Sequence, residues 1–196
     1  MNQEELDIIL ENHGKWLRNE GGDRADLSNA DLKNTNLRFA NLRLAYLRGA
    51  DLSNANLRGA NLRFADLNNA NLSNADLSNA NLSIADLNNA NLSNADLSNV
   101  NLSNANFRGV DLSDANLTWV NWQDVRGLTV VAVQVDTTRK NNQIAYIKEL
   151  HIWTTGCFQG KLYKLKSSIE KTHKDNEKLK KRYYRVIDFI LREAEE

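Results

Sequence analysis

Few side chains in this sequence could act in catalysis or bind a metal ion. The imidazoles are His13, His151 and His173, and the one thiol is Cys157. His151 and Cys157 are six residues apart, which matches no structural zinc spacing, and further cysteines are absent. The sequence also has no glycine-rich phosphate loop and no carboxylate pair placed for general acid and base work. We therefore expect no enzyme activity, no cofactor and no metal site.

The composition is that of a globular protein with balanced charge. The chain has 196 residues, with 25 basic and 25 acidic side chains, and 41% of its residues are hydrophobic. Its first residues lack the basic and apolar regions of a signal peptide, and no apolar run reaches the roughly 18 to 20 residues of a membrane span. A single cysteine fits a reducing compartment. We expect a cytoplasmic protein without a membrane span.

A five-residue repeat dominates the sequence from Ala25 to Asp124. Each of its twenty units reads small residue, Asp or Asn, Leu, polar residue or Arg, and then usually Asn or Gly. A spacing of five fits neither the period of a helix nor that of a flat strand. Equivalent leucines must have equivalent surroundings, and burying each one contributes about 2 kcal/mol. We therefore expect the chain to coil around a leucine-filled axis, with alanine at a second inward position.

Tandem units such as Ala25-Asp26-Leu27-Ser28-Asn29 resemble the signature of the pentapeptide-repeat family. This resemblance implies an all-β solenoid, a right-handed quadrilateral β-helix with four pentapeptides in each coil. Twenty repeats then make about five coils. The sequence departs from the repeat pattern where Thr35 replaces Ala, where Tyr46 replaces Asp or Asn, and where Phe107 and Trp122 replace the central Leu.

The segments that flank the repeat are predicted to be an N-terminal helix and a C-terminal extension. Residues 3–19 place apolar side chains on one helical face and precede Gly21-Gly22, so we expect a helix that caps the open end of the β-helix. Beyond the repeat we predict a β-hairpin followed by α-helices. The expected strands are 128–135 and 143–147 around a turn-rich segment at 136–142, and the expected helices are 160–173 and 177–195. The predicted domains are a capping helix at 1–24, the β-helix at 25–124 and the extension at 125–196.

One set of outward positions in the repeat is apolar. With four pentapeptides per coil, residues twenty apart stack on one face, and Leu44, Phe64 and Ile84 then form an apolar ladder where most repeats carry Asn or Gly. Such a ladder is typical of a docking surface for a partner, but the chain's own terminal segments could cover it instead. The candidate partner surface consists of Phe39, Arg43, Leu44, Arg63, Phe64 and Ile84.

Basic residues gather in the first two expected coils. We interpret them as a solvated surface with local pairing to aspartates, and an anion site is the alternative. They are Lys33, Arg38, Arg43, Arg48, Arg58 and Arg63.

The expected C-terminal helix carries two stripes. Its apolar stripe comprises Leu179, Tyr183, Val186, Ile187, Ile190 and Leu191. Three interpretations stay open for it, namely a cap on the chain's own β-helix, a homodimer contact or a partner contact; the dimer rests on family members that dimerise through a C-terminal helix. The basic stripe is either solvated or a nucleic-acid contact. It comprises Lys171, Lys174, Lys178, Lys181 and Arg185. This tail is similar to extensions on some phage and bacterial members of the family.

The family resemblance also implies one candidate activity. Some members mimic duplex DNA with an acidic rod, act on DNA gyrase and topoisomerase IV, and protect gyrase from quinolones. Mimicry requires a dense negative surface, whereas residues 25–124 carry a net charge of only −3 and residues 125–196 carry +6. We therefore favour a noncatalytic scaffold or protein–protein interaction module with an unidentified partner. DNA mimicry is the first alternative, and nucleic-acid binding through the basic C-terminal helix is the second.

Overall fold

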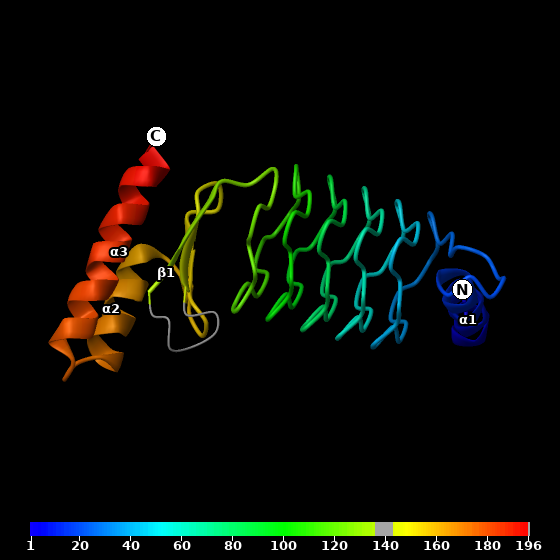
Figure 1. Ribbon diagram of the computed structural model, residues 1–196, viewed down its shortest axis with the longest axis horizontal. Coiled ribbons are helices and arrows are strands. Elements are labelled where there is room, and N and C mark those ends of the chain that lie inside the picture. The colour runs from blue at the N-terminus through cyan, green and yellow to red at the C-terminus, as the bar shows by residue number, and fades with distance from the viewer. Residues whose placement is uncertain (136–142, 196) are drawn as a thin grey trace. The chain divides into compact units, whose positions relative to one another are not determined.

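The computed structural model describes residues 1–135 and 143–195, without the side chain of Gln134 (Figure 1). The segment predicted to be rich in turns, 136–142, lies outside the described residues. The chain divides into two compact units. We call them the repeat unit, which comprises Met1–Asn116 and Val120–Gly127, and the C-terminal unit, which comprises Leu117–Trp119 and Leu128–Glu196.

Each pentapeptide turns the chain through a residue with a left-handed backbone. In the first repeat, the amide of Ala30 donates a hydrogen bond to the carbonyl of Leu27 at 3.1 Å, and Asn29 between them has a φ of 58°. The same turn follows at intervals of five residues along the repeat. Asn and Gly adopt this conformation at the lowest cost, which explains why they dominate the last position of the pentapeptide.

The Asp or Asn that precedes the central leucine braces the turn. Asp26 accepts a hydrogen bond at Oδ1 from the amide of Ser28 at 3.1 Å, and Asn61 accepts the equivalent bond from the amide of Arg63 at 3.2 Å. The Oδ1 acceptor exists in both side chains, so Asp and Asn are interchangeable at this position. Turn formation thus requires an oxygen acceptor at this position and does not require its charge.

Successive coils stack in register. The amide of Leu27 donates to the carbonyl of Tyr46 at 2.8 Å, and the amide of Tyr46 donates back to the carbonyl of Ala25 at 3.0 Å. Parallel bridges join residues that are twenty apart, from Asp26↔Tyr46 to Asn106↔Arg126. Four pentapeptides therefore separate bridged residues, and the repeat unit is a β-helix solenoid whose stacked coils are visible in Figure 1.

Leucine and alanine fill the interior of the β-helix, as the five-residue spacing predicts. The central residues from Leu27 to Leu102 are at most 1% exposed, and Phe107 at the same position is fully buried. Alanines of the first position, such as Ala45 and Ala65, are also buried. Where Thr35 replaces alanine, its hydroxyl donates to the carbonyl of Leu32 at 2.7 Å, which satisfies the buried polar atom.

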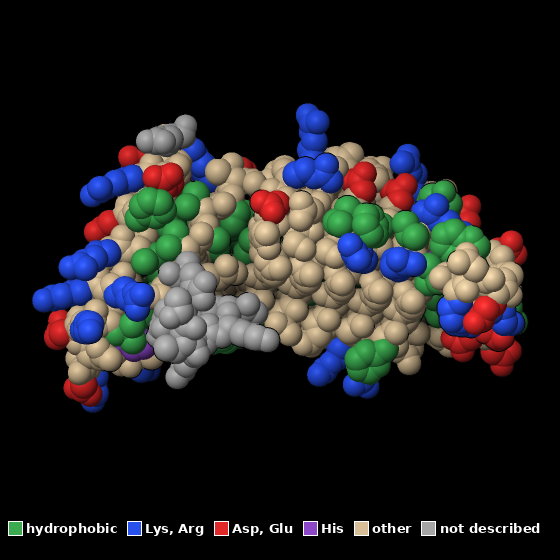
Figure 2. All heavy atoms as spheres, in the orientation of Figure 1, with side chains coloured by type: hydrophobic (Ala, Val, Ile, Leu, Met, Phe, Trp, Pro, Cys, Tyr) green, Lys and Arg blue, Asp and Glu red, His purple; other side chains and the backbone are tan. Residues whose placement is uncertain are grey.

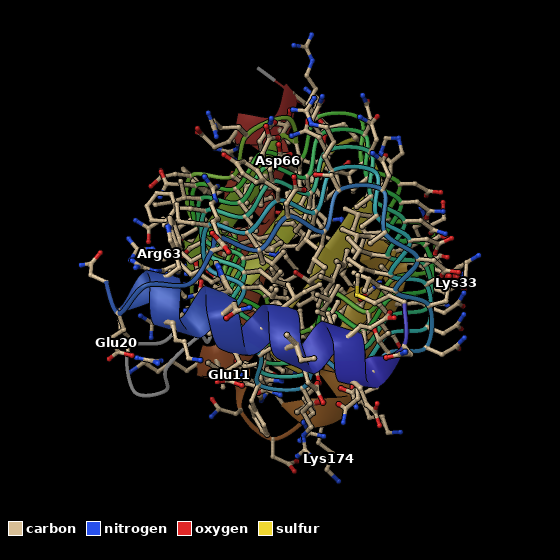
Figure 3. The ribbon with its side chains drawn as sticks, turned by 90° about the vertical axis from the view of Figure 1, so that its right-hand side faces the viewer. Glu11, Glu20, Lys33, Arg63, Asp66 and Lys174 are labelled. Carbon is tan, nitrogen blue, oxygen red and sulfur yellow. The ribbon has the colours of Figure 1, made fainter. Side chains whose placement is uncertain are left out.

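Helix α1, Gln3–Leu17, lies across the N-terminal coil of the repeat unit (Figure 3). It begins with a capping box, in which the side chains of Asn2 and Glu5 each accept a hydrogen bond from the other's amide. The side-chain amide of Gln3 pairs with the backbone of Asn36, accepting from its N–H at 3.1 Å and donating to its C=O at 3.2 Å. The helix thus binds a backbone edge that would otherwise be open to another chain.

His13 joins α1 to both ends of the first coil. Its side chain is fully buried. Its Nδ1 accepts a hydrogen bond from the amide of Ala25 at 3.0 Å, and its Nε2 lies 3.1 Å from the carbonyl oxygen of Arg43. These partners assign the neutral tautomer with the proton on Nε2. Burial lowers the pKa of His13 below its ordinary value, and the nearby charges of Arg24 and Arg43 act in the same direction.

The C-terminal unit contains a four-stranded antiparallel sheet in the order β1-β2-β3-β4. Its strands are β1 at Val130–Gln134, β2 at Gln143–Ile147, β3 at Ile152–Thr154 and β4 at Gln159–Gly160. The predicted antiparallel pairing of the first two strands is confirmed, with Ala132 opposite Ala145. The last two strands were not predicted, because two or three residues are too few to show alternation.

Two helices complete this unit, α2 at Leu162–Thr172 and α3 at Glu177–Glu195. They lie side by side next to the sheet (Figure 1). Val135, Ile144 and Trp153 from the sheet region form one buried core with Leu165 of α2 and Ile187 of α3. None of the described helices is both long and apolar enough to span a membrane.

Acidification is expected to loosen α1 through His13. The unfolded chain binds a proton at this residue with an ordinary pKa of about 6.5, whereas the folded pKa is lower. The stabilisation is therefore complete above about pH 6.5 and is lost as the pH falls from there through the folded pKa. Hydrogen exchange of the α1 amides, corrected for intrinsic rates, should accelerate over that window.

The variant His13→Gln keeps one donor and one acceptor but does not titrate, so its α1 exchange should not accelerate in this window. His173→Gln, in the C-terminal unit, is the matched control and should behave like the original chain. An unchanged pH dependence in His13→Gln would assign the effect to another group.

Candidate functional site

The apolar ladder and Phe39 occupy left-handed turn positions in the repeat unit. The φ values are 59° at Phe39, 66° at Leu44, 61° at Phe64 and 61° at Ile84. Most of the other equivalent positions in the repeat carry Asn or Gly, and the exceptions are Asp114, Trp119 and Asp124. Residues twenty apart bridge between coils, as the definition of the ladder assumes, and the structure adds that these side chains occupy a conformation that does not suit them.

This conformation carries a cost in stability. A left-handed backbone costs a residue with a β-carbon about 1–2 kcal/mol, and it is a marked outlier for a β-branched residue such as Ile84. Asn at the same position would reduce that cost. The ladder residues therefore lower the stability of the repeat unit through their backbone conformation. Residues held in strained conformations commonly have a functional role.

The aromatic members are well exposed. Phe39 is 67% exposed and Phe64 is 38% exposed, while Leu44 and Ile84 are half-buried. Phe39 lies over Gly59 of the next coil, where a β-carbon would come within 2.5 Å of the ring. Figure 2 shows hydrophobic side chains gathered beside basic ones on the visible face of the repeat unit. Exposed apolar side chains that gather in this way are typical of interaction sites.

Arginines lie on the exposed rings. The guanidinium of Arg63 is 4.7 Å from the centroid of Phe64, and that of Arg38 is 4.8 Å from the centroid of Phe39. The basic residues of the first coils do not form one patch, because Arg63 and Lys33 project from different sides of the repeat unit (Figure 3).

An aromatic and cationic cluster continues the ladder toward α1. The guanidinium of Arg24 lies 3.6 Å from the ring centroid of Tyr46 and 5.8 Å from that of Trp16. Its Nε donates to the carbonyl of Leu44, and its Nη1 donates to the Tyr46 hydroxyl at 2.7 Å. Sequence reasoning missed this cluster, although Arg24 precedes Leu44 by the coil spacing of twenty and Tyr46 departs from the repeat.

A hollow adjoins the other end of the ladder. It has a volume of about 390 Å³ and is lined by Ile84, Asn104 and Arg126. All three residues belong to the repeat unit. The surface therefore extends from an exposed aromatic cluster near α1 to a concave region beside Ile84.

The apolar stripe of the C-terminal helix serves its own unit. Ile187 and Ile190 are buried in the core between the helices and the sheet. Tyr183, Val186 and Leu191 pack against that core, and Leu179 is half-buried. The apolar stripe thus packs against the sheet of its own unit. None of the three interpretations from the sequence named this contact.

The predicted basic stripe is solvent-exposed along its whole length, at Lys171, Lys174, Lys178, Lys181 and Arg185. Lys180, which lies outside the stripe, is the lysine that pairs with Glu170, at 3.2 Å. The basic stripe therefore faces solvent, as either of its two interpretations requires.

The candidate catalytic groups do not come together. His13 is used in packing, His151 lies with Nδ1 at 3.1 Å from the Tyr146 hydroxyl, and Cys157 is a free, exposed thiol. Across residues 1–135 and 143–195, no group of three or more His, Cys, Asp or Glu side chains is arranged to hold a metal ion.

A family model described as pentapeptide repeats matches this sequence in several overlapping copies. The matched ranges are 25–63, 45–83, 55–94 and 85–121. They fall within the repeat and do not reach the C-terminal extension. The comparison with curated proteins found no match.

Solved structures of pentapeptide-repeat proteins are similar to the chain over the same region. Rfr23 from the cyanobacterium Cyanothece 51142 is 32% identical, over 53% of this chain and 81% of its own, with a TM-score of 0.47. The protein alr5209 from Nostoc Pcc 7120 is also 32% identical, over 60% of this chain and 93% of its own, with a TM-score of 0.46. Full-length QnrB1, described as a plasmid-mediated fluoroquinolone resistance protein, is 18% identical over 56% of this chain and 69% of its own, with a TM-score of 0.25.

Replacing a ladder residue by asparagine should stabilise the repeat unit. Ile84→Asn relieves the left-handed strain, so the free energy of unfolding should rise by about 1 kcal/mol. The reverse substitution Asn74→Ile, at an equivalent turn with a φ of 58°, should lower it by a similar amount. Urea denaturation measures both changes. A loss of stability in Ile84→Asn would show that the ladder serves packing instead.

Proposed function

Since the chain belongs to the pentapeptide-repeat family, whose members are generally structural or interaction modules rather than enzymes, we propose that it is a noncatalytic module that binds a protein partner. The partner contacts the candidate surface formed by Phe39, the apolar ladder and the adjoining arginines. The observation that carries this proposal is the presence of exposed apolar side chains in left-handed turns where asparagine would be more stable.

The arginines of this surface are available to a partner. Lys33 pairs with Asp51 and Arg48 pairs with Asp66, each at 3.3 Å. Within the described residues, Arg38 and Arg63 form no ion pair with an acidic side chain and instead lie on phenyl rings. Guanidinium groups oriented in this way suit carboxylates. The partner surface is therefore expected to present apolar side chains beside Asp or Glu.

Partner capture by the immobilised full chain tests the proposal. Proteins from an extract of the cells that express the chain are quantified by mass spectrometry, with and without the double substitution Leu44→Asn and Phe64→Asn. Asparagine suits the turn, so the variant should fold. The specific partner should be depleted by at least about tenfold, as expected for central interface residues.

A relocation control separates a specific surface from general stickiness. Into the same double variant, Asn54→Leu and Asn74→Leu introduce two apolar side chains at equivalent turns, which lie twenty residues apart on another face. Capture should stay low. Unchanged capture in the double variant, or full recovery in the relocated one, would show that the ladder is not the binding surface.

DNA mimicry toward DNA gyrase or topoisomerase IV is the alternative function. The aspartates it would require are engaged in turns: Asp111 accepts hydrogen bonds from the hydroxyl of Ser113 at 2.6 Å and from its amide at 2.9 Å. The same hydroxyl and amide lower the pKa of Asp111. The scaffold explains these acids and the repeat has little net charge, so we favour the interaction module.

A gyrase supercoiling titration distinguishes the two functions. At micromolar concentrations the chain should leave supercoiling unchanged, because its repeat is a weak polyanion. A gel-shift lane with the same plasmid detects direct DNA binding by the basic stripe. Inhibition of supercoiling without a shift would replace the interaction module by DNA mimicry.

Three further features belong to the proposal. We take the β-helix to have about five coils, from twenty repeats at four per coil. The segments 1–24, 25–124 and 125–196 are taken as cap, binding rod and extension. A homodimer through α3 would use its outer face, where Phe189 is 50% exposed, because Ile187 and Ile190 are buried within their own unit.

A further inference from the structure

The C-terminal unit contains a pocket of its own. Its volume is about 470 Å³, within the range of about 300–1,000 Å³ that is usual for small-molecule sites. The lining residues come from β2, the β2–β3 connection, β3, the start of α2 and the end of α3. All of them belong to the C-terminal unit, so the pocket is independent of the candidate surface on the repeat unit.

Aromatic rings form much of the pocket. Tyr146 and Trp153 are directly opposite each other on β2 and β3, and their rings stack with centroids 4.8 Å apart. Trp153 is only 2% exposed, so it holds the wall from behind, and the half-buried ring of Tyr146 is the part of the wall that a ligand can reach. Tyr163, in the first turn of α2, is 68% exposed although it is a large aromatic residue. A fixed wall and a free ring at the rim suit a flat aromatic ligand.

Two lysines supply positive charge to the same pocket. Lys161 precedes α2, and its Nζ donates to the carbonyl of Leu150 at 3.4 Å. Lys166 lies with its Nζ 6.0 Å from the ring centroid of Tyr184. Within the described residues, neither lysine forms an ion pair with an acidic side chain, and the pocket lining contains no Asp or Glu. The first turn of α2 also has no acidic residue.

His151 lines the pocket in a strained conformation. Its φ is 51°, and its Nδ1 lies 3.1 Å from the Tyr146 hydroxyl. The hydrogen bond fixes the imidazole beside the aromatic wall. A left-handed residue that is not glycine and that lines a pocket is a common feature of binding sites.

From the aromatic wall, the two unpaired lysines and the oriented imidazole, we infer that this pocket binds a flat aromatic small molecule that carries an anionic group. The ring of the ligand packs against Tyr146 and Tyr163, and its phosphate or carboxylate contacts Lys161 and Lys166. This site is distinct from the proposed protein-binding surface and does not depend on it.

Isothermal titration calorimetry on the full chain tests the inference with defined probes. Adenosine monophosphate and indole-3-acetate carry the two anionic groups, adenosine and indole are their uncharged counterparts, and inorganic phosphate is the anion alone. At least one charged probe should bind with a Kd below about 1 mM, and the uncharged counterparts and phosphate should bind more weakly. Which charged probe binds identifies phosphate or carboxylate as the preferred group.

Variants assign the binding to this pocket. Tyr163→Ala and Lys166→Gln should each weaken binding by about fivefold or more, because each removes one contact with the probe. Lys164→Gln is the matched control, since Lys164 is an exposed lysine of α2 outside the lining. Far-ultraviolet circular dichroism verifies that each variant is folded. The ladder variant Leu44→Asn with Phe64→Asn should bind the probes normally.

Three results would overturn the inference. The first is the absence of binding by both charged probes at millimolar concentration. The second is equal binding by the original chain and by folded Tyr163→Ala and Lys166→Gln. The third is equal binding of charged and uncharged probes, or of inorganic phosphate alone, because either would remove one half of the stated chemistry.

Discussion

The β-helix depends on a turn that needs a left-handed backbone once in every five residues. Asn29 and its equivalents adopt this conformation at low cost, and each turn returns the next leucine to the interior. The Asp or Asn three residues earlier holds the turn through a hydrogen bond to the backbone. Because every coil uses the same turns, residues twenty apart bridge in register and the core becomes continuous. Side chains that do not suit the turn are therefore conspicuous, and Phe39 and the apolar ladder are the clearest examples.

Much of the repeat unit could be predicted from the sequence, because its contacts have a fixed separation. Leu27 and later central residues are buried as their spacing indicates, and the column of Leu44, Phe64 and Ile84 follows from the coil length. Charge counting was less informative. It counts Asp26 only as a surface charge, and the structure shows that this exposed side chain is also a hydrogen-bond acceptor in a position that asparagine fills equally well. The interchange of Asp and Asn along the repeat was the available signal.

Contacts between unrelated segments could not be predicted. The stacking of Arg24 between Trp16 and Tyr46 requires the direction in which α1 crosses the first coil, and no periodicity contains that direction. In the C-terminal unit, β1 and β2 were predicted, but no periodicity shows that they cover the apolar face of α3. The strands β3 and β4 have too few residues for alternation to be visible. The pocket beside Trp153 was missed because it forms only where β2 and the short strand β3 place an aromatic wall beside the lysines of α2.

The constant separation of bridged residues also has a consequence for how the chain folds. A coil that joins an existing one closes a loop of about the same length wherever it lies, so the entropy lost in closure does not grow with the length of the rod. Each coil contacts only its nearest neighbours, and folding can start at any pair of coils and propagate in both directions. Insertion or deletion of twenty residues would then change the length of the rod without altering the remaining steps. Evolution could therefore adjust the size of this protein in units of one coil.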